Sequence, residues 1–184
     1  MEENKTAMEL PCGYKFSPGD KEIVKYFLKQ KILNEPLEHD TIPSVDLECY
    51  DDPDHLPLRD FKNKAENEWF FYTSRPKRKP LTKNGCWREH KEEEVLDGQE
   101  LVGFVQKFDY YYNLANPPEE RKFEWYINEY RIEPSVMEAY QLDETTKQKV
   151  LNLVVCKVFR EEIETTMDEE AGNCQSSDEE IGHE

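Results

Sequence analysis

After residue 67 the chain is a succession of short aromatic and β-branched segments. They are WFFY at 69–72, the stretch at 101–112, FEWYIN at 123–128 and LVVCKVF at 153–159. Turn-forming residues lie between them, namely Asn84-Gly85, Asp97-Gly98 and Asn116-Pro117. Such segments are typical of half-buried strands. Because they follow one another without intervening helices, the sequence predicts an α+β domain with an antiparallel sheet.

One amphipathic helix is predicted before these strands. Residues 18–33 carry apolar side chains at helical spacing, with lysines at 21, 25 and 29 on the other face. Pro36 is expected to end this helix. Residues 36–61 hold four prolines, which predicts an irregular connector with at most brief helices or strands. Residues 134–149 are polar and fit either a loop or a short helix.

The charge of the chain is unevenly distributed. The formal net charge is −17, and residues 161–184 contribute −10 of it, with ten acids and no Lys or Arg. This tail has little apolar content, which predicts disorder. Residues 62–91 carry nine basic and three acidic side chains, a net charge of +6. The net charge of the whole chain is therefore a poor guide to its partners.

No arrangement of catalytic or metal-binding residues stands out in the sequence. Cys86 and His90 lie four positions apart in a charged segment, which is weak support for a thiol and its base. The four histidines show no ligand spacing, and the five cysteines form no Cys-x-x-Cys pair. We therefore expect no catalytic residue, no metal, no cofactor and no small-molecule substrate.

The sequence also gives no sign of a membrane or secretory segment. No apolar run approaches the ~18 residues that a membrane helix needs. Residues 1–10 lack the hydrophobic core of a secretory signal. The scattered, odd-numbered cysteines do not suggest a disulfide framework, so a reduced intracellular protein is expected.

The positive signal for function is the segment 75–88. It contains no acid and six cations: Arg75, Lys77, Arg78, Lys79, Lys83 and Arg88. With Trp87 anchoring them to the core, these cations would line a strand and loop that meet a polyanion such as nucleic acid. Two other interpretations stay open on charge alone. The segment fits a solvated loop, and residues 77–80 (KRKP) have the character of a nuclear-import signal.

Nine blocks along the chain are similar, in order, to the NAC domain of plant transcription factors. EWFFY at 68–72 resembles the family's EWYFF, SRPKR at 74–78 its SRPNR, and EWYINEYRI at 124–132 its DWVMHEYRL. The other blocks lie at 10–16, 18–23, 45–57, 85–88, 101–103 and 153–159. The resemblance covers residues 10–160, which we take as one domain between a disordered arm (1–9) and the acidic disordered tail (161–184).

The resemblance implies a twisted antiparallel β-sheet flanked by helices, in a nuclear protein that binds double-stranded DNA. It also implies a homodimer, or a heterodimer with other NAC-type proteins. An edge strand of the family enters the major groove, and its equivalent here is residues 86–92. The DNA-binding residues expected from this are Arg75, Lys77, Arg78, Lys79, Lys83, Arg88, His90 and Lys91. The dimer contact is expected at Leu10, Pro11, Gly13, Lys15 and Glu22, where a Lys15–Glu22 pair replaces the family's Arg–Glu pair.

The expected DNA strand departs from the family pattern. Where the family has WKATGKDK, this chain has WREHKEEE at 87–94, so Glu89, Glu92 and Glu94 replace an alanine and two lysines. Acids that face phosphates weaken the electrostatic part of DNA binding. A second function therefore stays open: a protein-interaction module that dimerises with other NAC proteins and modulates them while it binds DNA weakly.

Overall fold

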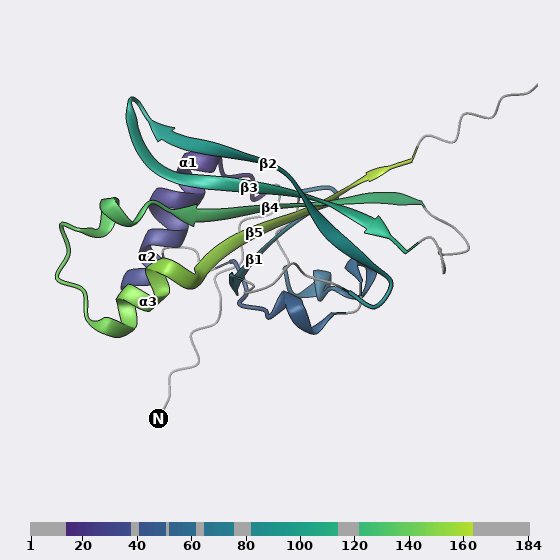
Figure 1. The fold of residues 1–184 in the computed structure, drawn as a ribbon, viewed down its shortest axis with the longest axis horizontal. Coiled ribbons are helices and arrows are strands. Elements are labelled where there is room, and N and C mark those ends of the chain that lie inside the picture. The colour runs from purple at the N-terminus through teal and green to yellow at the C-terminus, as the bar shows by residue number, and fades with distance from the viewer. Residues whose placement is uncertain are drawn as a thin grey trace, which may run out of the picture.

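A computed structural model describes residues 14–37, 41–50, 52–61, 65–75, 82–113 and 122–163. Its centre is a twisted sheet of five antiparallel strands in the order β1-β5-β4-β3-β2 (Figure 1). The strands are β1 (Glu68–Ser74), β2 (Gly85–Asp97), β3 (Glu100–Tyr112), β4 (Phe123–Ile132) and β5 (Leu153–Glu162). The predicted α+β class, with an antiparallel sheet flanked by helices, is confirmed.

The hairpin β2–β3 is the longest pairing and closes through a two-residue loop. Asp97 pairs with Glu100, which leaves Gly98 and Gln99 as the loop. Gly98 has a φ of +66°, a conformation that costs a glycine little and that hairpin turns of this length require. The turn predicted at Asp97-Gly98 is therefore confirmed. In Figure 1 this hairpin extends beyond the rest of the sheet at the upper left.

The predicted N-terminal helix begins two residues late and ends where expected. It runs as α1 (Asp20–Glu22), a π-helical turn η1 (Ile23–Leu28) and α2 (Lys29–Leu33). It ends at Asn34, whose left-handed φ of 55° stops the helix. The π-helical turn is a departure from the predicted regular helix. Such turns are rare, and apolar spacing does not distinguish them from an α-helix.

The helix packs its apolar face on one face of the sheet. The buried residues on it are Ile23, Val24, Phe27, Leu28 and Ile32. Each such side chain contributes about 1.5–3 kcal/mol when fully buried. Two tyrosines of the sheet fix the helix further: Tyr72 donates to the Phe27 carbonyl oxygen at 3.0 Å, and Tyr130 donates to Asp20 Oδ1 at 2.7 Å.

Close contact between helix and sheet depends on Gly103 in β3. A Cβ atom at this position would lie 2.9 Å from Val24 Cγ1 and 2.4 Å from the carbonyl oxygen of Arg131. The backbone of β4 cannot move away without disrupting its own pairing, so a side chain does not fit. Gly103 thus lets the helix approach the sheet.

The connector is irregular, as predicted. It contains three short 3₁₀ turns, η2 (Leu47–Cys49), η3 (Pro53–His55) and η4 (Leu58–Asp60). Aspartates cap the first two: Asp46 accepts from the Glu48 N–H and Asp52 from the Asp54 N–H. The connector adds Phe61 to the core, where it packs on Phe16 and Phe70.

The segment after β4 forms a 3₁₀ turn, η5 (Pro134–Met137), and a helix, α3 (Glu144–Asn152). This decides the choice left open for residues 134–149 in favour of short helices. Asp143 caps α3 by accepting from the Thr146 N–H at 2.8 Å. β5 then runs to Glu162, two residues past the expected end of the domain at 160. The expected arm (1–9) and the rest of the tail (164–184) lie outside the described residues.

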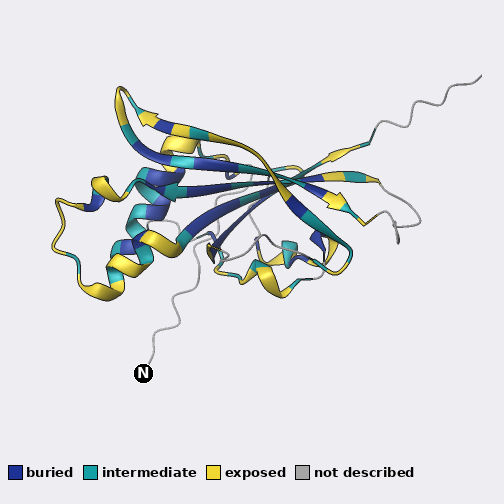
Figure 2. Cartoon of the chain, viewed as in Figure 1, coloured by how far each residue is buried: buried dark blue, intermediate teal, exposed yellow. Residues whose placement is uncertain are grey.

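Burial differs sharply across the sheet. Figure 2 shows that β1 is largely buried and that β4 and β5 are mostly buried or half-buried, whereas most of β2 is exposed. The fully buried side chains of the sheet include Trp125, Tyr72, Tyr130, Phe70 and Phe71. Because β2 is also an edge strand, it is the part of the sheet most accessible to a partner.

Candidate nucleic-acid interface

The strand β2 is anchored to the core at its start. Trp87 is buried and meets Tyr110 edge-to-face, with ring centroids 4.9 Å apart. The Tyr110 hydroxyl shares a hydrogen bond of 2.6 Å with Thr82 Oγ1. A Cβ at Gly85 would lie 2.3 Å from the Tyr111 carbonyl oxygen, so glycine is needed at this close crossing. The predicted anchoring role of Trp87 is confirmed.

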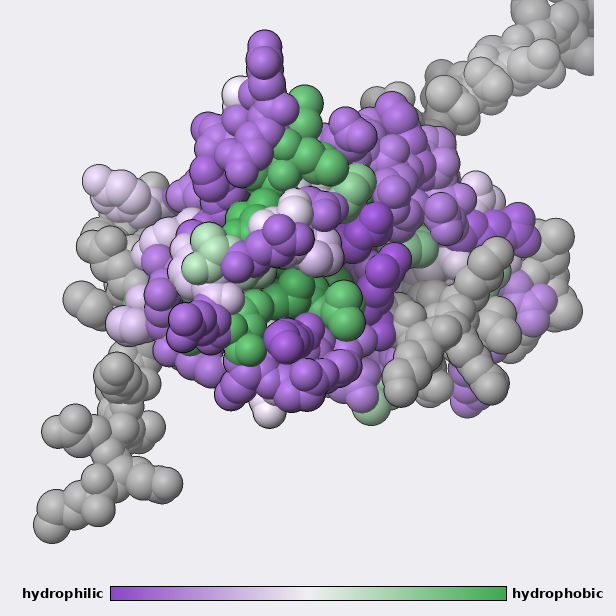
Figure 3. Space-filling view, turned by 60° about the vertical axis from the view of Figure 1, so that its left-hand side comes forward, coloured by the Kyte–Doolittle hydropathy of each residue, from purple (hydrophilic) through white to green (hydrophobic). Residues whose placement is uncertain are grey.

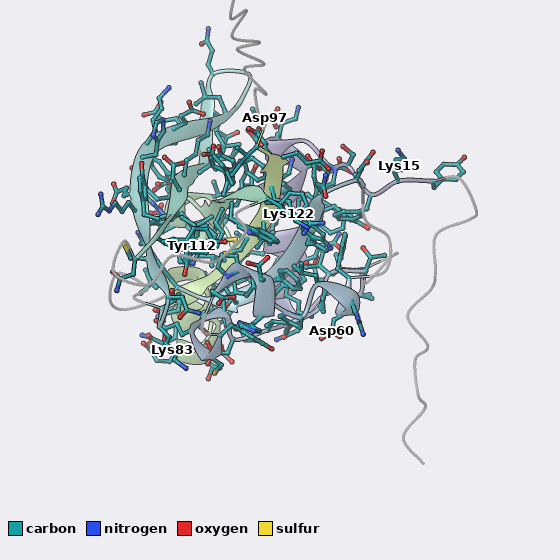
Figure 4. All side chains as sticks on the ribbon, turned by 90° about the vertical axis from the view of Figure 1, so that its right-hand side faces the viewer. Lys15, Asp60, Lys83, Asp97, Tyr112 and Lys122 are labelled. Carbon is teal, nitrogen blue, oxygen red and sulfur yellow. The ribbon has the colours of Figure 1, made fainter. Side chains whose placement is uncertain are left out.

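Two expected DNA-binding cations lie at this anchored end without a carboxylate partner in the described part of the chain. Lys83 is exposed, and Figure 4 shows it at the periphery of the molecule, well apart from Asp97 at the other end of β2. Arg88 is exposed and its guanidinium carbon lies 4.6 Å from the centre of the Tyr111 ring. An aromatic ring orients a guanidinium without neutralising its charge. Both charges are therefore available to an anion.

Three other expected DNA-binding residues have acidic partners within the chain. Arg75 Nε lies 3.4 Å from Glu129 Oε1, and Lys91 Nζ lies 2.7 Å from Glu93 Oε1. His90 Nδ1 lies 3.3 Å from an oxygen of Asp109. The pairing of β2 with β3 shifts register between Glu89 and Lys91, so His90 sits in a bulge.

Most acids of β2 are likewise neutralised by the chain itself. Glu92 accepts a hydrogen bond from Arg131 at 2.8 Å, and Glu93 lies 2.7 Å from Lys107 Nζ. At the hairpin end, Asp97 pairs with the helix residues Lys21 and Lys25. By contrast, the exposed Glu89 and Glu94 have no cation partner among the described residues.

These pairs shift the proton affinity of the acids. Hydrogen bonds from Lys107 and Lys91 lower the pKa of Glu93 to about 2. The hydrogen bond from Arg131 lowers the pKa of Glu92, and those from Lys25 and Lys21 lower the pKa of Asp97. The three carboxylates are consequently ionised at neutral pH, and each offsets the positive charge of the side chains it pairs with.

The remaining expected site residues are only partly placed. Lys77, Arg78 and Lys79 lie outside the described residues, as do Leu10, Pro11 and Gly13. Lys15 and Glu22 are both exposed, and neither forms an ion pair with another described residue. Figure 4 shows Lys15 on a segment that projects from the body of the molecule. Both side chains of the expected dimer pair are thus accessible.

Sequence reasoning missed two buried carboxylates next to this region, Asp52 and Glu129. Glu129 is 4% exposed and Asp52 is 7% exposed. Burial raises the pKa of Glu129, and the nearby Arg75 and Arg131 counteract that shift. A signal existed for Glu129: it continues the inward-facing alternation of Trp125 and Ile127, where an apolar residue is expected. Asp52 gave no comparable signal.

Other kinds of site find little support in the described residues. No group of three His, Cys, Asp or Glu side chains among them is arranged to hold a metal ion. None of the helices described is both long and apolar enough to cross a membrane. A hollow of about 360 Å³ lies between η5 and α3, and Figure 3 shows apolar atoms gathered among charged ones on this side of the molecule. Its walls are mostly apolar: Pro134, Met137, Tyr140, Leu142, Val150 and Leu151.

Comparison with known proteins identifies the family. The family model described as "No apical meristem (NAM) protein" matches residues 11–132. The chain is 29% identical to NAC domain-containing protein 26 of Arabidopsis thaliana over 167 residues, which are 86% of this chain and 40% of that protein. It is 30% identical to NAC domain-containing protein 92 of the same plant over 174 residues, 90% of this chain and 58% of the relative.

A rice relative gives the same result. NAC domain-containing protein 54 of Oryza sativa subsp. japonica is 32% identical over 162 residues, 83% of this chain and 23% of that protein. The chain therefore belongs to the NAM, or NAC-domain, family of plant transcription factors. In each of these three relatives, the match spans less than two thirds of the relative's length.

Proposed function

We propose that this chain is a nuclear transcription regulator that binds double-stranded DNA sequence-selectively through β2. It would act as a homodimer or as a heterodimer with another NAC-type protein. One observation carries the proposal: Lys83 and Arg88 keep uncompensated charges at the anchored start of an exposed edge strand. This strand corresponds in position to the strand that the family inserts into the major groove. An arginine there has the geometry to donate two hydrogen bonds to a guanine.

The internal ion pairs favour a second candidate function, the protein-interaction module. Arg75 and Lys91 each have a carboxylate partner, which reduces the charge that these residues present to phosphates. Neutralisation of phosphates supplies most of the sequence-independent affinity for DNA. A chain with few available cations would bind DNA weakly while it still paired with other family members.

A binding selection at several salt concentrations separates the two functions. The purified chain is mixed with a pool of random duplexes, and the bound fraction is sequenced. Enrichment of one sequence class supports the DNA-binding regulator. Weak binding without enrichment, lost at moderate salt, supports the interaction module because only the electrostatic component is then present. Sedimentation of the same sample tests the dimer, and a monomer at micromolar concentration contradicts it.

A further inference from the structure

Asp52 and Glu129 are the buried acidic residues of the described chain, and each contacts an expected DNA-binding residue or a neighbour of one. Glu129 pairs with Arg75, the residue that directly follows β1. Asp52 contacts Asn84, the residue before β2. Burying a carboxylate is costly unless it is paired or hydrogen-bonded. Two such acids next to the same region of the molecule require a specific explanation.

Glu129 fixes Arg75 from the middle of the sheet. It lies in β4, opposite Gln106 of β3 and Cys156 of β5, so its carboxylate sits in the sheet's interior. Arg75 Nε lies 3.4 Å from Glu129 Oε1. The backbone N–H of Arg75 also donates to the Asn152 carbonyl oxygen at 2.6 Å. Arg75 is thus held by its backbone and by its side chain.

Asp52 ties the start of β2 to the connector. Its Oδ2 accepts a hydrogen bond from Asn84 Nδ2 at 2.6 Å, and its Oδ1 accepts from the Asp54 N–H at 3.1 Å. His55 Nδ1 lies 2.8 Å from the same Oδ1. The Asn84 carbonyl oxygen in turn accepts from the Asn113 N–H at 2.8 Å. One carboxylate therefore joins η3 to the residue that precedes β2.

We propose that Glu129 and Asp52 are positioning residues for DNA: Glu129 fixes Arg75, and Asp52 fixes Asn84, which lies between Lys83 and the strand that carries Arg88. The proposal rests on the proposed function, because it concerns the same surface. Interactions made with an already ordered group lose less entropy on binding than those made with a mobile one. Burial of the two acids costs solvation free energy, and the proposal is that the resulting order of the cations lowers the entropy cost of binding DNA.

If Glu129 served folding alone, its replacement would lower the thermal midpoint, and the positioning role predicts otherwise. Burial raises its pKa, so the ionised form is disfavoured by its surroundings. The Arg75 side chain is 45% exposed, so water can solvate the guanidinium that Glu129→Gln leaves without its carboxylate, and the change removes the cost of burying the Glu129 charge. Glu129→Gln should therefore keep or raise the thermal midpoint while it lowers DNA affinity. A purely structural residue cannot produce that combination.

The first test is a mutant cycle of Glu129→Gln and Arg75→Ala. We expect each single change to lower DNA affinity by the same factor and to flatten the dependence of log affinity on log salt by about 1 unit. The double variant should lose no more than either single one, because both remove the same positioned contact. Glu138→Gln is the matched control, since Glu138 is an exposed acid on η5's C-terminal side.

The second test uses Asp52 and its partner. Asp52→Ala and Asn84→Ala should weaken DNA binding equally and without additivity. Asp52→Asn keeps an oxygen acceptor for Asn84 and should restore part of the affinity. Asp60→Ala is the control, because Asp60 is an exposed acid on the same connector (Figure 4).

Amide hydrogen exchange without DNA separates this proposal from the proposed function. Faster exchange at Arg75 in Glu129→Gln, and at Asp54 in Asp52→Ala, shows that the two carboxylates order these segments, and this readout does not depend on DNA. Unchanged exchange at both positions overturns the positioning role even where the wild type binds DNA. If the wild type binds no duplex, the proposed function fails and the positioning role for DNA fails with it, while the ordering of the segments still stands. The positioning role is overturned if the wild type binds DNA and these variants keep its affinity and salt slope. It is equally overturned if Glu129→Gln binds DNA more tightly, since Glu129 would then withhold Arg75 from phosphates.

Discussion

The two edge strands of the sheet, β1 and β2, are built in opposite ways. β1 has seven residues, and five of them, Trp69 to Thr73, are buried. The connector covers its outer edge: the Tyr72 N–H donates to Pro43, and the Val45 N–H donates to Tyr72. β2 has thirteen residues, of which only Trp87 and Val95 are buried. In the described part of the chain, no segment pairs with its outer edge.

The difference shows how one sheet supplies both a core and a contact surface. An uncovered edge invites pairing with other chains unless charge or bulges prevent it. β2 has both: a bulge at His90 and a run of acids, Glu92 to Glu94. The bulge and the acids both disfavour pairing of this uncovered edge with another chain. Among the described cations of β2 and of the two residues before it, Lys83 and Arg88, which flank the Trp87 anchor, have no acidic partner.

The largest effect on stability should come from truncating a buried side chain in β1, the covered edge strand. Phe71 is fully buried in β1, so Phe71→Ala should lower the free energy of unfolding by about 3–5 kcal/mol. Leu96 in β2 is 48% exposed, and Leu96→Ala should change the free energy of unfolding by less than about 0.5 kcal/mol. Urea denaturation measures both. Similar losses at the two positions would contradict the contrast between the edges.

A second, smaller effect should come from the contact between helix and sheet. Gly103→Ala places a methyl group against the Arg131 carbonyl oxygen and Val24, and should cost about 1–3 kcal/mol. The change Gly19→Ala meets no atom within 4 Å, and its cost is limited to the poorer capping of α1 by alanine, less than about 1 kcal/mol. Thermal unfolding of the pair checks this. A neutral Gly103→Ala would mean that the helix is less closely packed than described.

A third effect concerns acid. The pKa of Glu93 is lowered from 4.5 to about 2, so its ion pairs contribute stability above pH 4.5 that is lost as the pH falls towards 2. Glu93→Gln lacks this contribution and should lose less stability over that range. Glu129 has the opposite sign, because its raised pKa makes its ionisation unfavourable to folding as the pH rises above 4.5. Urea titrations from pH 2 to 7 measure both, and parallel curves for Glu93→Gln and wild type would contradict the first sign.

The smallest effect should distinguish two acids on β2 itself. Glu92→Gln removes a negative charge and also releases Arg131, whereas Glu94→Gln only removes a charge. Glu92→Gln should therefore raise non-specific DNA affinity more than Glu94→Gln, at low salt above all. Binding to a random duplex measures this difference. Equal gains would indicate that Arg131 does not reach the bound DNA.

The sequence was sufficient for the strands whose side chains follow a local pattern. The alternation at 123–128 and 153–159 predicted β4 and β5, and helical spacing predicted the position of the N-terminal helix. The extension of β2 to Asp97 was not predicted, because Glu92 to Glu94 disfavour a strand locally. The long partner strand β3 overrides that preference by pairing along its whole length.

The candidate site was harder to predict, since its ion pairs join distant segments. Arg75–Glu129 and Glu92–Arg131 form only because the register of the sheet brings their strands together. A sequence shows which residues carry charge, but the pairing that neutralises them depends on register. For that reason Arg75, Lys91 and Arg88 could not be ranked from the sequence, whereas the structure pairs Arg75 and Lys91 with acids.

The most direct test of the account is the effect of Arg88→Ala on DNA binding. Its affinity for a selected duplex should fall by ~1–3 kcal/mol, and the preference at one base pair should relax, if Arg88 reads a guanine. Arg59→Ala, an exposed arginine in η4, serves as the control and should leave both unchanged. If Arg88→Ala keeps the wild-type affinity, base preference and salt slope, then β2 does not contact DNA through its anchored start, and the interaction module becomes the better account.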